Sequence, residues 1–166
     1  MKIQYKKLNK TAKEPVQAHK TDAGFDLFAN DNVIITTSSL AAVGTGIAFN
    51  IPKGYFGKIE ERSGFSLKNT LKLKAGVVDA GYQGEVKVVF VNAGDAPVKI
   101  YQGDKIAQLV IHKLPPINLV EVEEFDEESE RGEKGFGSSD AKEPTSNTKT
   151  EIKKGTVVIS TSKNKT

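Results

Sequence analysis

The chain has 166 residues, a net charge of +3, 27% charged side chains, and neither cysteine nor tryptophan. This length suits one domain that buries roughly 70% of the surface of its unfolded chain. The lack of cysteine excludes disulfides and cysteine-based zinc sites, and no stretch approaches the roughly 18 apolar residues of a membrane span. With no apolar signal segment either, we expect a cytoplasmic protein that makes no membrane contact.

Short apolar stretches separated by turn residues run through residues 1–122, which we expect to form a β core. The turns between them are rich in Asn, Asp, Gly and Pro, which favour bends in the backbone. Strands so short and so closely spaced predict an all-β fold, a distorted jelly roll or β-barrel-like single domain. A helical turn is expected only at residues 65–69. The predicted strands are 25–28, 33–35, 47–51, 55–59, 86–91 and 106–111.

The composition changes after residue 122. Residues 123–140 are first acidic and then glycine-rich, with few apolar side chains besides Phe125 and Phe136. Such a segment cannot bury itself, so we expect a flexible C-terminal arm that closes over a ligand and excludes water. Residues 141–166, rich in Lys, Thr and Ser, are typical of a solvated, mobile tail. Binding of nucleic acid through these lysines is the less favoured alternative.

Two segments are suited to phosphate. In the first, Arg62 offers a planar fork of donors, Ser63 a hydroxyl and Gly64 an unobstructed backbone N–H. The second is the glycine-rich stretch 131–139. The alternative for the first segment is an exposed turn whose arginine covers apolar surface. Gln108, a polar residue in an apolar strand, fits a ligand site or simple alternation toward solvent.

The segment 76–84 is the clearest candidate site, because Asp79 lies there at the end of an apolar strand, among three glycines. Asp is disfavoured in strands and glycine adds no packing, so the pattern indicates bare backbone and one carboxylate facing a ligand. Asp79 can orient and deprotonate a water, or only satisfy its own turn. Tyr82 can support a sugar or be an ordinary strand residue. It faces away from Asp79 unless a bulge intervenes at Gly81.

Together these segments predict a site for a nucleoside phosphate, and their order resembles that of the trimeric dUTPase family. The matching segments are 23–27, 62–64, 76–82, 106–109 and 131–139. The chain also looks similar to the enzymes carried by phages of Gram-positive bacteria, which would act in the host cytoplasm. The resemblance implies a jelly-roll-like homotrimer whose sites are shared between subunits. It also implies that water attacks the α-phosphorus of dUTP, giving dUMP for thymidylate synthesis and pyrophosphate, and keeping uracil out of DNA.

The resemblance also implies a role for each matching residue. Asp79 would be the catalytic residue that holds the attacking water. Asp26 would reach a Mg²⁺ ion, through water, because magnesium keeps several waters and takes oxygen ligands from the triphosphate. The implied substrate-binding residues are Arg62, Ser63, Gly64, Gly76, Val77, Val78, Tyr82, Gln108, Arg131, Phe136, Gly137 and Ser138.

One departure from the family pattern supports an alternative hypothesis, that the chain is similar to dCTP deaminases. Gly81 stands where the family commonly has another aspartate, which makes the segment similar to the hairpin of dCTP deaminases. Those enzymes need a glutamate base in the next strand, and Val89 stands about where it would be. A valine cannot transfer a proton, so deamination is disfavoured. A third hypothesis is a regulatory binding protein in which nucleotide controls closure of the Phe136 arm.

Overall fold

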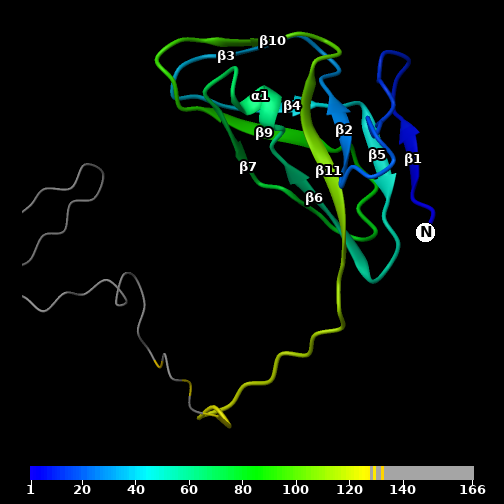
Figure 1. Cartoon of the computed structure of the whole chain (residues 1–166), viewed down its shortest axis with the longest axis vertical. Helices are drawn as coiled ribbons and strands as arrows, with labels where there is room; N and C mark the ends of the chain where they lie inside the picture. Colours follow the sequence, from blue (N-terminus) through cyan, green and yellow to red (C-terminus); the bar gives the residue numbers. More distant parts are fainter. Residues whose placement is uncertain (128, 130–131, 133–166) are drawn as a thin grey trace, which may run out of the picture. The chain divides into compact units, whose positions relative to one another are not determined.

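The computed structural model describes residues 1–127, 129 and 132 (Figure 1). The chain divides into two compact units, Met1–Leu119 and Val120–Thr166, and every helix and strand described here lies in the first. In chain order the elements are β1 (Gln4–Lys7), β2 (Gly24–Phe28), β3 (Val33–Ile35), β4 (Leu40–Gly44), β5 (Ile47–Asn50), β6 (Tyr55–Glu60), α1 (Ser63–Ser66), β7 (Leu71–Lys74), β8 (Val77–Val78), β9 (Lys87–Asn92), β10 (Val98–Ile100) and β11 (Lys105–Lys113).

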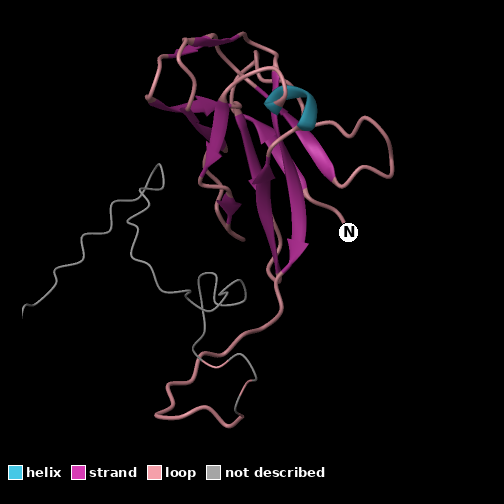
Figure 2. Ribbon diagram, turned by 60° about the vertical axis from the view of Figure 1, so that its left-hand side comes forward, coloured by secondary structure: helices cyan, strands magenta, loops and turns pink. Residues whose placement is uncertain are grey.

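The strands form antiparallel sheets that join distant parts of the sequence, with α1 as a single helical turn (Figure 2). The sheet orders are β2-β11-β6-β8, β4-β9-β7, β1-β5 and β3-β10. The all-β prediction is therefore confirmed. The barrel-like part of it is wrong, because the described strands pair into four separate sheets rather than one closed sheet.

All six predicted strands are present, as β2, β3, β5, β6, β9 and β11, and α1 occurs close to the predicted helical turn. The list of predicted strands lacks β1, β4, β7, β8 and β10. Of these, β4 and β7 flank β9 on its two sides. The sequence of β4 is Leu-Ala-Ala-Val-Gly, which has little β-propensity of its own. These segments are extended because β9, whose side chains alternate between exposed and buried, offers each of them a ladder of backbone hydrogen bonds.

A buried asparagine joins the end of β9 to its surroundings. The side chain of Asn92 is fully buried, and its amide donates hydrogen bonds to the carbonyls of Ile35 and Ala96 at 3.0 and 2.8 Å. Its oxygen accepts hydrogen bonds from the Thr70 hydroxyl and the Gly94 N–H at 2.7 and 3.0 Å. A buried amide with all four contacts satisfied fixes the packing of β3 and β9 in one arrangement.

Within the residues that the structure describes, no helix is long and apolar enough to cross a membrane.

Candidate active site

The segment around Asp79 lies at the edge of the four-stranded sheet. The short strand β8 pairs with β6 only, through Val77 with Lys58 and Val78 with Gly57. The backbone of Ile59 donates to the carbonyl of Gly76 at 2.7 Å. In the described part of the chain, the other edge of β8 has no strand beside it. Its N–H and C=O groups can therefore pair with a ligand as they would with a strand.

A tight turn follows β8 and determines where the next side chains point. The Tyr82 N–H donates to the Asp79 carbonyl at 3.2 Å, and Gly81 has a φ of 85°. A positive φ at this place is typical of a type II turn and strongly favours glycine. The turn explains why glycine replaces the aspartate that the family pattern has there. It also places Asp79 and Tyr82 on one hollow, rather than on opposite faces as a regular strand would.

This hollow, the hairpin hollow, has a volume of about 370 Å³. The Asp79 carboxylate is exposed at its rim, while Val78 is buried beneath it. The Tyr82 ring is 48% exposed, and its hydroxyl donates to the Glu85 carbonyl at 3.0 Å. A Cβ on Gly84 would approach that hydroxyl to 2.6 Å, so a side chain there would displace the Tyr82 ring. The residues lining the hollow are Ile59, Ala75, Gly76, Val77, Val78, Asp79, Tyr82, Glu85, Val86 and Lys87.

The backbone that enters the hairpin hollow is unusual. Ala75, which precedes Gly76, has a φ of 53°. This angle lies in the left-handed region, which residues other than glycine rarely adopt. A Cβ on Gly76 would lie 3.1 Å from the Ile59 carbonyl oxygen, so there is little room for a side chain. The backbone at 75–76 is thus held close against β6.

The predicted phosphate residues gather in a second place, the phosphate hollow, of about 260 Å³. Its lining includes Asp26, Arg62, Ser63, Gly64 and Gln108. Sheet pairing brings these sequence-distant segments together, because β11 lies between β2 and β6.

The register of β11 against its two neighbouring strands determines which of these side chains are adjacent. Gln108 of β11 is opposite Asp26 of β2 on one side and opposite Glu60 of β6 on the other. Its amide donates to the Glu61 carbonyl at 3.0 Å, at the point where the chain turns from β6 into Arg62 and α1. The sequence identified these residues, but their adjacency depends on pairings between distant strands.

Asp26 is the buried charge of the phosphate hollow, with only 7% of its surface exposed. Its Oδ1 accepts a hydrogen bond from Arg62 Nε at 2.6 Å, and its Oδ2 lies 2.8 Å from Lys105 Nζ. Sequence reasoning missed Lys105. The signal that could have found it is a lysine beside the predicted strand that carries Gln108.

The described residues contain no group of three or more His, Cys, Asp or Glu side chains placed to hold a metal ion. The carboxylate of Asp26 is the acidic oxygen donor among the predicted residues of the phosphate hollow. This donor set fits Mg²⁺ held mainly by phosphate oxygens and water, since magnesium retains waters and needs few protein ligands.

The two hollows share no lining residue, so in the described part of the chain Asp79 lines a different hollow from Arg62 and Gln108. Each hollow contains one half of the predicted site. The predicted residues Arg131, Phe136, Gly137 and Ser138 lie outside the described residues.

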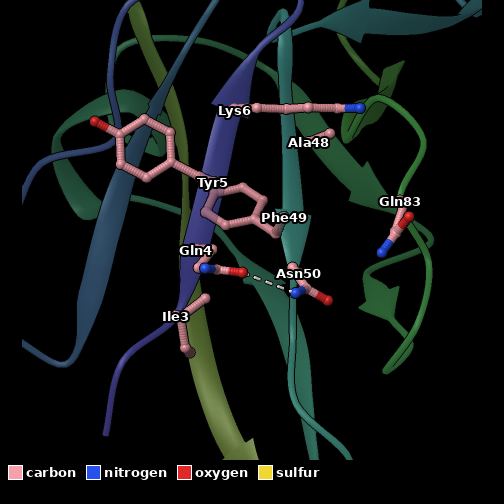
Figure 3. Close-up of a pocket in the computed structure, with 8 residues that line it drawn as sticks. All are labelled: Ile3, Gln4, Tyr5, Lys6, Ala48, Phe49, Asn50 and Gln83. Atoms are coloured by element: carbon pink, nitrogen blue, oxygen red, sulfur yellow. Dashed lines mark hydrogen bonds between the residues drawn. The ribbon is translucent and has the colours of Figure 1, made fainter.

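A larger hollow of about 580 Å³ lies on β1, β5 and the neighbouring Gln83 (Figure 3). Gln4 and Asn50 form a hydrogen bond across the two strands at 3.0 Å, and the rings of Tyr5 and Phe49 have their centres 6.4 Å apart. None of the predicted site residues lines this hollow.

Comparison with known proteins identifies the family. The family model for dUTPase matches residues 10–140. The deoxyuridine 5'-triphosphate nucleotidohydrolase of Clostridium tetani is 40% identical over 82% of this chain and 95% of its own length. The protein of the same name from Saccharomyces cerevisiae is 39% identical over 84% of this chain and 93% of its own length.

Solved structures of phage dUTPases have the same fold. The dUTPase of Staphylococcus bacteriophage 80alpha, solved with dUPNHPP and described as controlling transfer of virulence genes, has a TM-score of 0.79 at 36% identity. That match covers 83% of this chain and 98% of the phage protein. A mutant dUTPase from phage phi11 of S. aureus, described as coordinating a structural Mg(II) ion, has a TM-score of 0.73 at 31% identity, over 76% of this chain and 100% of that one.

These matches confirm the predicted jelly-roll-like fold and the resemblance drawn from the five sequence segments. Because the family model covers most of the chain and relatives of about 40% identity align along it, this chain belongs to the dUTPase family.

Proposed function

We propose that this chain hydrolyses dUTP to dUMP and pyrophosphate by attack of water on the α-phosphorus. Its membership of the dUTPase family supports this reaction. The observation that carries the mechanism is the hairpin hollow, where the exposed Asp79 carboxylate adjoins bare backbone and the Tyr82 ring. In this role Asp79 orients the water and accepts its proton, a contribution worth about 10²–10⁴-fold in rate.

The backbone of 76–78 supplies the base recognition in this mechanism. Uracil presents carbonyl and N–H groups in a row, and the outer edge of β8 offers complementary backbone groups. The Tyr82 ring lies against the deoxyribose and leaves no room for a 2′-hydroxyl. The rigid backbone at Gly76, close to the Ile59 carbonyl, keeps the donors and acceptors at fixed positions.

The phosphate hollow holds the triphosphate. Arg62, Ser63, Gly64 and Gln108 donate hydrogen bonds to its oxygens, and the guanidinium of Arg62 matches phosphate geometry in two contacts. Asp26 orients water molecules bound to Mg²⁺, and the ion when bound neutralises the charge that develops on the phosphates. Arg131, Phe136, Gly137 and Ser138 remain predictions from the family pattern for the terminal phosphate and the base.

The position of the attack is tested with isotope-labelled water. We expect hydrolysis of dUTP in H₂¹⁸O to place the label in dUMP, because the new bond forms at the α-phosphorus. Mass spectrometry of both products measures it. Label in pyrophosphate would mean attack at the β-phosphorus and would contradict the geometry proposed for Asp79.

We propose a homotrimer, as the family resemblance implies, and the separation of the two hollows on one chain supports sites shared between subunits. In our proposal the hairpin hollow of one subunit faces the phosphate hollow of another, so that Asp79 and Arg62 of one site come from different chains.

Subunit mixing tests this arrangement. We expect Asp79→Asn and Arg62→Met each to lose most of their activity as pure preparations. When the two are unfolded and refolded together, hybrid oligomers should regain part of the activity, since some sites then combine two intact halves. The control is a mixture of wild type with a double variant carrying both changes in one chain. Mixtures that stay as inactive as the pure variants would contradict shared sites.

A regulatory role is a second candidate, favoured by the role described for the 80alpha dUTPase. Nucleotide-controlled binding to another macromolecule can coexist with catalysis on the same scaffold. Deamination of dCTP has no such support, and Val89 stands half-buried in β9 where the deaminases need a glutamate.

A further inference from the structure

Lys105 lies in the phosphate region without a role in the reaction as described so far. Its ammonium is 2.8 Å from Asp26 Oδ2, while Arg62 Nε is 2.6 Å from Asp26 Oδ1. Arg62 Nη1 also reaches the backbone carbonyl of Lys105, at 3.5 Å. One buried carboxylate is thus paired with two cations, of which only Arg62 belongs to the set that binds phosphate.

A β-bulge directs Lys105 toward Asp26. In a regular strand, Lys105 and Gln108 would point to opposite faces, because side chains alternate. The pairing of β11 with β2 shifts between Lys105 and Ala107, so that Lys105 is opposite Phe28 and Gln108 is opposite Asp26. The extra residue puts Lys105 on the same face as Gln108, which is a common effect of a bulge beside an active site.

The contact to Lys105 joins a partly exposed lysine side chain, 40% exposed, to a nearly buried carboxylate. Asp26 is 7% exposed, and the Lys105 ammonium also lies 5.9 Å from the centre of the Phe28 ring. A buried carboxylate needs a compensating partner at all times, because an unpaired charge in this position is strongly unfavourable. Arg62 contacts Asp26 through Nε, so phosphate binding competes with that pairing only where it draws Nε away from the carboxylate.

We propose that Lys105 is a positioning residue, whose ammonium keeps the Asp26 carboxylate paired and oriented while the Arg62 guanidinium turns from Asp26 to the triphosphate. This inference rests on the proposed function. In the free protein Asp26 is held from both sides. With substrate present, Lys105 holds Oδ2, and Oδ1 is left to accept hydrogen bonds from water bound to Mg²⁺. Lys105 therefore acts on the reaction through Asp26 and not by contact with the substrate.

The competing explanation is direct binding of phosphate. Lys105, Lys68, Lys99 and Arg62 all line a further hollow of about 430 Å³ next to α1. If Lys105 bound phosphate there, its removal would weaken nucleotide binding whether or not Asp26 carries a charge. The experiment separates these two explanations by changing the charge of Asp26.

The test measures the equilibrium affinity for α,β-imido-dUTP by calorimetry, with and without Mg²⁺, together with KM and kcat for dUTP. We expect Lys105→Met to weaken Mg²⁺-dependent binding by about tenfold to hundredfold, the range typical of a lost hydrogen bond to a charged group. KM should rise with it and kcat should change much less, because Asp79 is untouched. Lys105→Arg should restore most of the affinity. Lys99→Met, which removes a charge from the same hollow without a contact to Asp26, is the matched control and should resemble wild type.

A double-mutant cycle with Asp26→Asn decides the mechanism. Asparagine is neutral, so in that background Lys105→Met should cause no further loss of affinity. An equal loss in both backgrounds would overturn the proposal in favour of direct phosphate binding. An affinity of Lys105→Met equal to that of Lys99→Met would overturn it as well.

Folding and the proposed function are checked separately. If Lys105→Met does not fold, Lys105→Gln, which retains a donor for Asp26, takes its place in the cycle. A wild-type protein that neither binds the analogue nor hydrolyses dUTP would contradict the proposed function. An active wild type with an unaffected Lys105→Met variant would contradict this inference alone.

Discussion

Replacing Asp79 with asparagine is expected to lower kcat for dUTP by about 10²–10⁴-fold, the contribution typical of a general base. Asparagine has nearly the same size and can still hold a water, but it cannot accept the proton. Because the carboxylate is exposed at the rim of the hairpin hollow, the change leaves no buried group unpaired and the fold should persist. Affinity for α,β-imido-dUTP should stay close to that of wild type.

Asp95→Asn is the matched control for this variant, because Asp95 is an exposed aspartate in a turn outside both hollows. Single-turnover kinetics separate the chemical step from product release. A near-normal rate constant for Asp79→Asn would remove Asp79 from the role of base. A large loss of analogue affinity would instead indicate that its main contribution is to binding.

The second large effect is discrimination among nucleotides. We expect kcat/KM for dUTP to exceed that for dCTP by about 10⁴–10⁵, because cytosine would leave the backbone groups of 76–78 unpaired. Rejection of dTTP depends on a close-packed wall against one methyl group, which typically contributes about 1–3 kcal/mol. Rejection of UTP depends on the Tyr82 ring. Pyrophosphate release measured side by side for the four nucleotides tests all three expectations.

Variants of Tyr82 separate sugar recognition from base recognition. Tyr82→Ala should lower the preference for dUTP over UTP while the preference over dCTP remains, because the ring contacts the sugar and the backbone reads the base. Tyr82→Phe is the control that keeps the ring and loses only the hydrogen bond to the Glu85 carbonyl. Equal loss of both preferences in Tyr82→Ala would mean that the ring supports the backbone of the hairpin instead.

The sequence predicted those elements and residues that a local pattern of amino acids indicates. Alternation and turn residues predicted six strands, and the glycine-rich segment identified Asp79 and its neighbours. Among the missed strands, β4 and β7 are extended because they pair with β9, a contact between distant parts of the chain. Composition cannot indicate such pairings in advance.

The same holds for the site, where single residues could be predicted from the sequence but their adjacency could not. Asp26, Arg62 and Gln108 were each identified as candidates, yet their adjacency comes from the order β2-β11-β6. The role of Lys105 depends on one extra residue in β11, and a bulge leaves no clear mark in a short apolar run. The turn at Gly81 was foreseen only as an exception to regular alternation, and its φ of 85° makes that exception the actual geometry.

Ala75 has a consequence for how the base is read. An L-residue in the left-handed region is disfavoured by roughly 1–2 kcal/mol, whereas a glycine there would give up about 0.5–1 kcal/mol of conformational entropy on folding. The stability of the protein would therefore be similar with alanine or glycine at position 75. The two residues differ in the number of backbone conformations that they allow the folded loop. Alanine at 75 reduces the number of conformations open to the folded loop. If the segment binds uracil as proposed, less conformational entropy is then lost on binding.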